Sequence, residues 1–110
     1  MIEVVPILRV ADAARAMAWW SRLGFEHEST HRFHEGAPAF VSVRRERSRV
    51  FLSEHTGDAR PDTLLYFWMD DLDALAQEFG VEPETAGWSD DVREIELTDP
   101  DGNRLRIGQS

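Results

Sequence analysis

Apolar and polar positions follow two similar series along this 110-residue chain. The first series predicts a strand over 3–10, a helix over 13–22, a strand over 25–33, and a hairpin of strands over 39–43 and 49–53. The helix is predicted because apolar side chains recur every three or four positions and therefore share one face. They are Ala13, Ala16, Met17, Trp20 and Leu23. Pro6 indicates an edge or a bulge in the first strand.

The second series repeats this order after a polar segment, 55–62, whose Gly57 and Pro61 predict a linker. It predicts a strand over 63–69, a helix capped by Asp70 or Asp71 and ended by Gly80, a short strand over 81–85, and a hairpin over 92–97 and 104–107. The apolar face of this helix consists of Leu72, Leu75, Ala76 and Phe79. We therefore expect one α+β domain, 1–110, built from two βαβββ modules, 1–54 and 63–110.

Three short motifs mark the ends of these elements. Asp12 in Val10-Ala11-Asp12 is a helix N-cap, and Gly24 in Leu23-Gly24-Phe25 is typical of the residue just past a helix. The run Asp-Pro-Asp-Gly-Asn over 99–103 predicts a tight hairpin turn with Gly102 at positive φ. In this spacing the motifs resemble the glyoxalase / bleomycin-resistance / dioxygenase superfamily, whose modules form a curved mixed sheet. The resemblance covers nearly the whole chain.

Most enzymes of that superfamily hold a divalent metal at fixed strand positions, and the resemblance implies where those positions fall. Counting from the motifs places them at Val5, Phe51, Leu64 and Arg106. Three of these side chains are apolar and the fourth is a cation, whereas a divalent metal needs lone pairs from imidazole, carboxylate or water. We therefore expect no metal and no cofactor at this site.

In lacking the metal-binding side chains, this chain resembles one branch of the superfamily, the bleomycin-resistance proteins. These proteins keep the fold, lack the metal, and bind a cationic antibiotic at a homodimer interface without converting it. Their second-half strand is aromatic-rich, as is the run over 63–70 here. The resemblance thus implies a homodimeric binding and sequestration protein, not an enzyme. The alternatives are a glyoxalase- or dioxygenase-like metalloenzyme with a relocated metal, and a domain that serves only in protein interaction.

Aromatic side chains are the first candidates for ligand contact. Strand alternation places Tyr66 and Trp68 on the same face as Leu64, where their rings could stack on a planar ligand or hold a cation. Phe51 and Phe33 are weaker candidates of the same kind. Core packing or a dimer interface would explain these rings equally well.

Charged side chains are the second group of candidates. Trp88 precedes Asp90 and Asp91 in a polar loop, which favours a cationic aromatic ligand, although a loop anchor is an equal alternative. Glu94 and Glu96 share a strand face and could neutralise Arg106 or bind a cation; a solvated strand face is the alternative. The candidate ligand-binding residues are Phe33, Phe51, Tyr66, Trp68, Trp88, Asp90, Asp91, Glu94, Glu96 and Arg106.

Two apparent metal motifs are rejected. On a strand, His27 and His31 would share a face but lie ~13 Å apart, which is too far for one ion; the role of these residues and of His34 stays open. The turn over 99–103 begins like a calcium loop, but Ser110 stands where a bidentate glutamate is required.

Composition excludes several further functions. The absence of cysteine excludes disulfides, thiolate metal sites and cysteine nucleophiles, and is compatible with a cytoplasmic location. The formal charge of -9 argues against nucleic acid and favours a cationic or neutral small ligand. No apolar run has membrane-spanning length, and neither a nucleophile elbow nor a glycine-rich phosphate loop is present.

Overall fold

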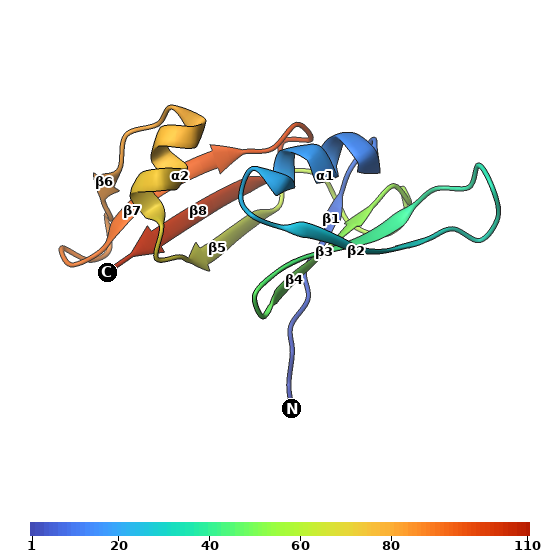
Figure 1. Ribbon diagram of the computed structural model, residues 1–110, viewed down its shortest axis with the longest axis horizontal. Coiled ribbons are helices and arrows are strands. Elements are labelled where there is room, and N and C mark those ends of the chain that lie inside the picture. Colours follow the sequence, from blue (N-terminus) through green and yellow to red (C-terminus); the bar gives the residue numbers. More distant parts are fainter. The chain divides into compact units, whose positions relative to one another are not determined.

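The computed structural model describes all 110 residues, which form two compact units. The first unit comprises residues 1–63 and 100–103, and the second comprises residues 64–99 and 104–110. Each unit contains one helix and one four-stranded sheet with parallel and antiparallel neighbours (Figure 1). The predicted α+β class and the two βαβββ modules are confirmed.

The sheet of the first unit has the strand order β1-β4-β3-β2. Strand β1 is parallel to β4, and the other neighbours are antiparallel. The elements are β1 (Ile7–Arg9), α1 (Ala13–Ser21), β2 (Glu26–His31), β3 (Phe40–Arg45) and β4 (Ser48–Ser53). Strand β1 is shorter than the predicted 3–10 because Pro6 has no N–H to donate, although its carbonyl still accepts from Phe51 N at 2.9 Å.

Helix α1 begins where the sequence predicts. The Oδ1 atom of Asp12 accepts from the backbone N–H groups of Ala14 and Arg15 at 3.0 and 3.3 Å, which satisfies two of the free donors of the first turn. Trp20 is fully buried and meets Phe25 edge to face at 5.1 Å between ring centroids. Its predicted core position is therefore confirmed. Helix α1 contacts β2, β3 and β4.

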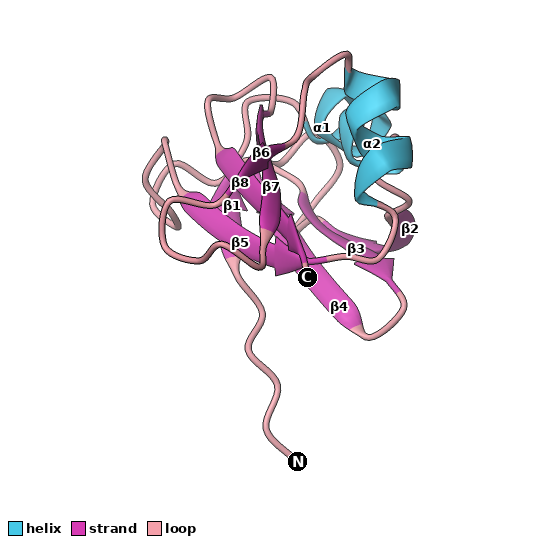
Figure 2. Cartoon of the chain, turned by 90° about the vertical axis from the view of Figure 1, so that its left-hand side faces the viewer, coloured by secondary structure: helices cyan, strands magenta, loops and turns pink.

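The second unit repeats the arrangement with the strand order β5-β8-β7-β6, in which β5 is parallel to β8. Figure 2 shows that strands make up most of the regular structure of this unit, with α2 as its helix. The elements are β5 (Leu64–Trp68), α2 (Leu72–Phe79), β6 (Glu84–Thr85), β7 (Arg93–Thr98) and β8 (Arg104–Gln109). The internal repeat in element order is thus confirmed.

The two ends of α2 differ in how well the sequence predicts them. Gly80 ends the helix in the left-handed conformation at φ +67°, as predicted. Asp71 occupies the N-cap position, but its side chain makes no capping hydrogen bond. Gln109 takes that role from β8, because its Oε1 accepts the N–H of Leu72 at 3.0 Å. A side chain from a distant strand has thus replaced the local cap.

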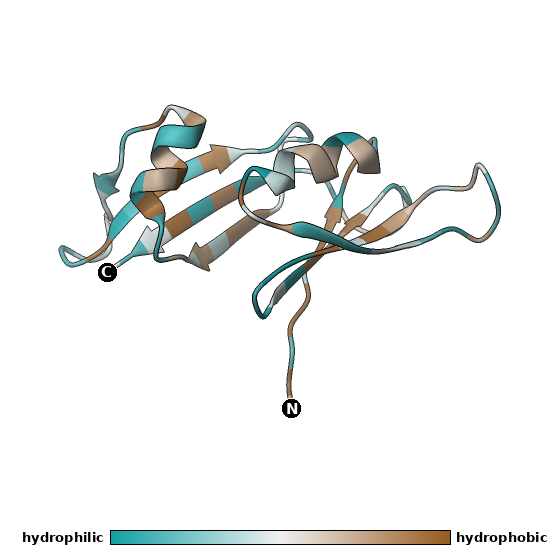
Figure 3. Cartoon of the chain, in the orientation of Figure 1, coloured by the Kyte–Doolittle hydropathy of each residue, from teal (hydrophilic) through white to brown (hydrophobic).

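One face of the second sheet is covered and the other is open. Helix α2 contacts β7 and β8, and Leu105 and Ile107 of β8 are fully buried. The alternation of hydropathy along β7 and β8 is visible in Figure 3. On β5 the exposed positions are Leu64, Tyr66 and Trp68, at 41, 39 and 59 % of full exposure. These three residues therefore share a face, as predicted.

The turn over 99–103 is anchored by its polar side chains. Gly102 has the predicted positive φ, at +86°. Within the first unit, Asp101 Oδ1 accepts from Ala11 N at 2.8 Å, and the buried Asn103 donates from Nδ2 to the carbonyl of Arg9 at 3.1 Å. Asp101 and Asn103, two of the side chains that resemble a calcium loop, thus serve as hydrogen-bond partners for the backbone. Neither helix has the length and apolar character needed to cross a lipid bilayer.

Candidate functional site

Three aromatic side chains gather on the open face of the second unit, and we call them the aromatic shelf: Tyr66, Trp68 and Trp88. Ring centroids lie 5.1 Å apart for Tyr66 and Trp68, 5.9 Å for Trp68 and Trp88, and 6.1 Å for Tyr66 and Trp88. Each pair meets edge to face, a favourable arrangement for aromatic quadrupoles. Trp68 and Trp88 are 59 and 60 % exposed, so both side chains keep surface that a planar partner can contact.

Different parts of the chain supply the shelf. Alternation along β5 projects Tyr66 and Trp68 from the same face. Trp88 comes from the loop between β6 and β7, whose ends are joined by a 2.8 Å hydrogen bond from Ala86 N to the carbonyl of Val92. The sequence nominated all three rings, and the structure brings them together.

Glu94 on β7 links two rings of the aromatic shelf by hydrogen bonds. Its carboxylate accepts from Trp88 Nε1 at 2.9 Å and from the hydroxyl of Tyr66. These hydrogen bonds, first that from Tyr66 and then that from Trp88, hold the pKa of Glu94 below its usual value. Burial of the phenol, followed by its hydrogen bond to Glu94, raises the pKa of Tyr66 to about 12. The ring is partly exposed, but its hydroxyl end is the covered part, because it lies over β8 and against Glu94.

An acidic pocket of about 600 Å³ adjoins the shelf. Trp88 belongs to both, and Glu94, the hydrogen-bond acceptor of Trp88, also lines the pocket. The pocket is lined by Val81, Glu82, Glu84, Thr85, Gly87, Trp88, Glu94, Ile95, Glu96 and Arg106. Register places Glu84 directly opposite Glu94, a like-charge pair that costs stability unless something offsets it.

The charges of the acidic pocket are unevenly compensated. Glu96 accepts from Arg106 Nε at 3.0 Å, and Arg104 Nη1 lies 3.9 Å from the same oxygen. Four carboxylates against one guanidinium in the lining leave three net negative charges. The exposed side chains of Glu82 and Glu84 carry most of that excess, since Glu94 and Glu96 already have donors. The pocket is therefore suited to a cation.

The remaining candidate residues lie elsewhere. Phe33 and Phe51 belong to the first unit, where Phe51 lies 5.0 Å from the ring of Phe40. Phe33 is 78 % exposed and has His31 and His55 as ring neighbours at 5.0 and 6.0 Å. Asp90 and Asp91 are exposed in the loop after Trp88 and are not among the residues that line the acidic pocket. They would act on a ligand in the pocket only through long-range electrostatic attraction.

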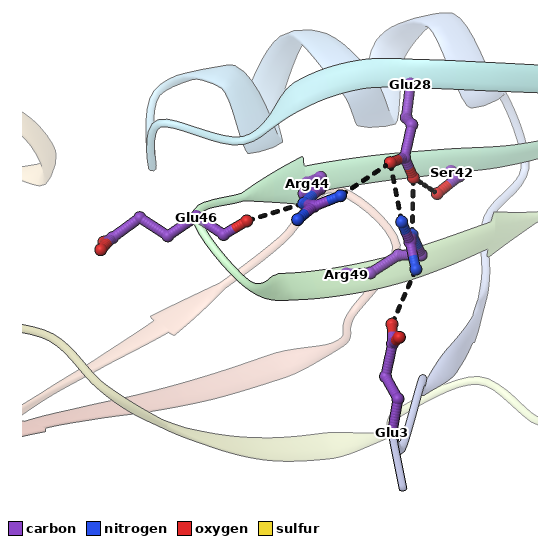
Figure 4. Close-up of polar contacts among 6 residues, drawn as sticks. All are labelled: Glu3, Glu28, Ser42, Arg44, Glu46 and Arg49. Atoms are coloured by element: carbon purple, nitrogen blue, oxygen red, sulfur yellow. Dashed lines mark hydrogen bonds and ion pairs between the residues drawn. The ribbon is translucent and has the colours of Figure 1, made fainter. Parts of the chain in front are cut away.

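The first unit carries an ion-pair cluster formed by Glu3, Glu28, Arg44 and Arg49 (Figure 4). Arg49 binds both oxygens of Glu28, from Nε at 2.6 Å and Nη2 at 2.8 Å, and reaches Glu3 from Nη1 at 2.8 Å. Ser42 Oγ also donates to Glu28, at 2.6 Å. The hydrogen bonds from Arg49 and then from Ser42 lower the pKa of Glu28 to about 2. The two carboxylates and two guanidinium groups of this cluster therefore neutralise one another.

A β-bulge corrects the prediction for the histidines. The register of β2 against β3 shifts between His27 and Ser29, so that Glu28 is an extra residue. His27 then lies opposite Val43 and His31 opposite Phe40, on different faces of the sheet. The expectation that these two histidines share a face is wrong, because the bulge reverses the alternation.

The strand positions implied for a metal do not fit a divalent ion. Register places Phe51 beside Ile7, and Arg106 beside Tyr66, with Arg106 already paired to Glu96. Neither Phe51 nor Arg106 offers a lone pair, and neither do Val5 and Leu64. No group of three or more His, Asp or Glu side chains is arranged to hold a metal. A metal-free protein stays a prediction that metal analysis tests.

Sequence reasoning did not nominate three residues of this region: Glu82, Glu84 and Gly108. The first two follow Gly80 in a short segment whose structure the sequence pattern does not specify, so nothing in the sequence indicates that they line a pocket with Glu94. Gly108 carries a usable signal, because a glycine inside a strand often marks a close approach of another group.

Comparison with solved structures places the chain in the glyoxalase / bleomycin-resistance fold. A bleomycin-binding protein in complex with bleomycin superimposes with a TM-score of 0.74 at 20 % identity, over 100 % of this chain and 99 % of that one. The bleomycin resistance determinant encoded on transposon Tn5 matches with 0.74 at 21 %, over 100 and 98 %. A superfamily member from Sphaerobacter thermophilus matches with 0.77 at 20 %, over 100 and 98 %. At this identity the likeness shows the fold alone.

Sequence comparison then gives the family. The model described as "Glyoxalase superfamily protein" matches residues 1–110, so the chain belongs to that family. No curated protein sequence matches it.

Proposed function

We propose that this protein binds and sequesters a cationic small molecule with a planar ring system, of the bleomycin type, without converting it. The observation that carries the proposal is the junction of the aromatic shelf with the acidic pocket through Trp88 and Glu94. Such a junction suits a ligand that carries a flat ring and a positive group a short distance apart.

The shelf supplies the attraction for the ring. Stacking on an exposed indole removes apolar area from water and adds a contact of about 0.5–1.5 kcal/mol. Because Trp88 is already held by Glu94, less side-chain freedom is lost when a ligand stacks on it.

The acidic pocket supplies the attraction for the cation. Glu82 and Glu84 offer exposed carboxylates, while Glu94 and Glu96 are engaged by donors within the unit. The solved complex of a bleomycin-binding protein with the same fold supports the choice of ligand class.

Titration with bleomycin, followed by tryptophan fluorescence at low and high salt, tests the proposal. We expect saturable quenching and weaker binding at high salt, because the charge attraction is screened. Glu84→Gln should weaken binding by about threefold, whereas Asp90→Asn, outside the pocket, should change it by less than about twofold. An absence of binding by the unmodified protein in both salts would overturn the proposal.

Metal analysis separates this proposal from an enzyme. We expect the purified protein to retain less than one equivalent of divalent metal after dialysis, because the implied ligand positions lack lone pairs. A stoichiometric ion that survives dialysis would favour the metalloenzyme instead.

A homodimer is part of the same proposal. The N-terminal end of the chain lies away from the strands of its unit (Figure 1), and Ile2 and Val4 are 94 and 85 % exposed, although Glu3 between them is held by Arg49 of β4. Contact with a second chain would remove this apolar area from water, which is favourable. Light scattering should give about 25 kDa, twice the 12.6 kDa of one chain. A mass of one chain at working concentration would remove the dimer from the proposal.

A further inference from the structure

Gly108 lies near the C-terminal end of β8, between Trp68 of β5 and Glu94 of β7. A Cβ atom at this position would overlap the hydroxyl oxygen of Tyr66 and would lie 2.9 Å from its Cζ. It would also lie 3.1 Å from Cζ3 of Trp68. The ring of Tyr66 therefore crosses β8 at the one residue of that strand that has no side chain.

We propose that Gly108 is the positioning residue of the aromatic shelf: its missing side chain lets Tyr66 cross β8 and reach Glu94. This inference rests on the proposed function only in treating the shelf as the surface that meets the ligand. Gly108 itself contacts no ligand. It acts through Tyr66, and Tyr66 acts through Glu94 on Trp88.

The backbone does not require glycine at this position. Gly108 is absent from the positive-φ glycines, which are Gly24, Gly36, Gly80 and Gly102. It lies inside β8 and is paired on both sides. The corresponding position of the first unit, beside Arg9 of β1 and opposite Phe40 of β3, is Ser53. The fold thus accepts a side chain here, and the space taken by Tyr66 is what excludes one.

The consequence for the shelf follows from its hydrogen bonds. Glu94 accepts from Tyr66 and from Trp88. A methyl group at 108 lifts the phenol from β8 and separates it from Glu94. The carboxylate then holds Trp88 alone, and the angle between the rings that a ligand meets changes. Residue 108, which lies under Tyr66, therefore determines how the rings of the ligand-binding surface are arranged.

The composition of the chain allows a direct test with Gly108→Ala. Tyr66 is the one tyrosine of the chain, and all twelve residues counted as lysine or arginine are arginines. Because arginine stays protonated and lysine is absent, phenolate absorbance between about pH 9 and 13 reports Tyr66 while no other side chain ionises. We expect its ionisation midpoint to fall from about 12 toward the ordinary 10.0 in Gly108→Ala. Gly57→Ala is the matched control, because a Cβ there meets nothing within 4 Å and its φ is ordinary.

A double variant keeps the test decisive if Gly108→Ala folds poorly. Gly108→Ala combined with Tyr66→Leu removes the ring that occupies the space, and should fold and unfold like Tyr66→Leu alone. If the double variant is as defective as Gly108→Ala, the glycine serves the backbone and the proposal is overturned. An unchanged Tyr66 midpoint in a folded Gly108→Ala protein also overturns it.

Ligand binding is measured separately, so that the two proposals can fail independently. Gly108→Ala should weaken bleomycin binding by about tenfold, which is the effect of losing one aromatic contact. If the unmodified protein does not bind bleomycin, the proposed function fails, while the midpoint of Tyr66 still decides the role of Gly108. A lowered midpoint with unchanged bleomycin affinity would show that Gly108 places Tyr66 but does not set the ligand surface.

Discussion

The two units share a strand order and a register but present different chemistry on the same face. In the first unit, Ser42 of β3 and Ile7 of β1 flank Phe51 of β4. In the second unit, Glu96 of β7 and Tyr66 of β5 flank Arg106 of β8. The backbone has thus been repeated, whereas the side chains of the open face have not.

The two faces differ in how completely their charged and polar groups are paired within the protein. On the first unit, Arg49 engages both oxygens of Glu28 and one of Glu3, so the ion-pair cluster uses its donors internally. On the second unit, Trp68 and Trp88 stay exposed beside a pocket with excess negative charge. A surface whose groups are already paired gains little from a ligand, whereas exposed rings and carboxylates gain from one. A repeated backbone can therefore carry different side-chain chemistry on the open face of each repeat.

The covered faces provide the largest expected effect and test whether the two halves are equally well packed. Leu52 of β4 and Leu105 of β8 are both fully buried. Leu52→Ala and Leu105→Ala should each lower the free energy of unfolding by about 2–5 kcal/mol, because each leaves a cavity in its core. Urea denaturation gives both values. A loss below about 1 kcal/mol at either position would show that this half is loosely packed and that the likeness stops at topology.

Ring deletions on the open faces come next and test where the ligand binds. Trp88→Ala should weaken bleomycin binding by about tenfold or more, because it removes a stacking face and a donor to Glu94. Phe51→Ala is the matched change in the first unit, where the ring rests against Phe40 at 5.0 Å. We expect a smaller loss there, measured by the same fluorescence titration. Equal losses would mean that the first unit shares in binding and would break the contrast.

Acidification should give the smallest effect, and it compares a carboxylate of the first unit with one of the second. The pKa of Glu28 falls from 4.5 to about 2 on folding, so this group stabilises the native protein fully above about pH 4.5. That contribution is lost as the pH falls from about 4.5 to 2, because the carboxylate must then be protonated. Glu28→Gln should therefore flatten the dependence of unfolding free energy on pH in this window.

The matched control for this titration is Asp73→Asn in the second unit. Asp73 also has a lowered pKa, from its hydrogen bond with Arg93, but it belongs to an exposed pair without further donors. Its replacement should change the same pH profile less than Glu28→Gln does. The reverse order would show that the ion-pair cluster contributes no more than an ordinary surface pair.

Local patterns in the sequence were sufficient to predict the fold class and the order of its helices and strands. Apolar spacing and end signals such as Asp12, Gly80 and Gly102 predicted the order of the elements, and the structure confirms all three residues in their roles. Such signals work because a cap or a positive φ is decided by a few neighbouring residues. Alternation on β5 likewise predicted the common face of Tyr66 and Trp68.

Tertiary structure decided the rest, since it depends on residues that are far apart in sequence. No local pattern shows that Gln109 caps α2 or that an inserted Glu28 separates the faces of His27 and His31. The glycine at 108 signals a close approach, but the sequence does not show that the approaching group is Tyr66. Each of these outcomes depends on the register of one strand against another. Alternation along a regular strand predicts which side chains share a face, but only the paired sheet shows where a bulge interrupts that alternation and which side chains touch.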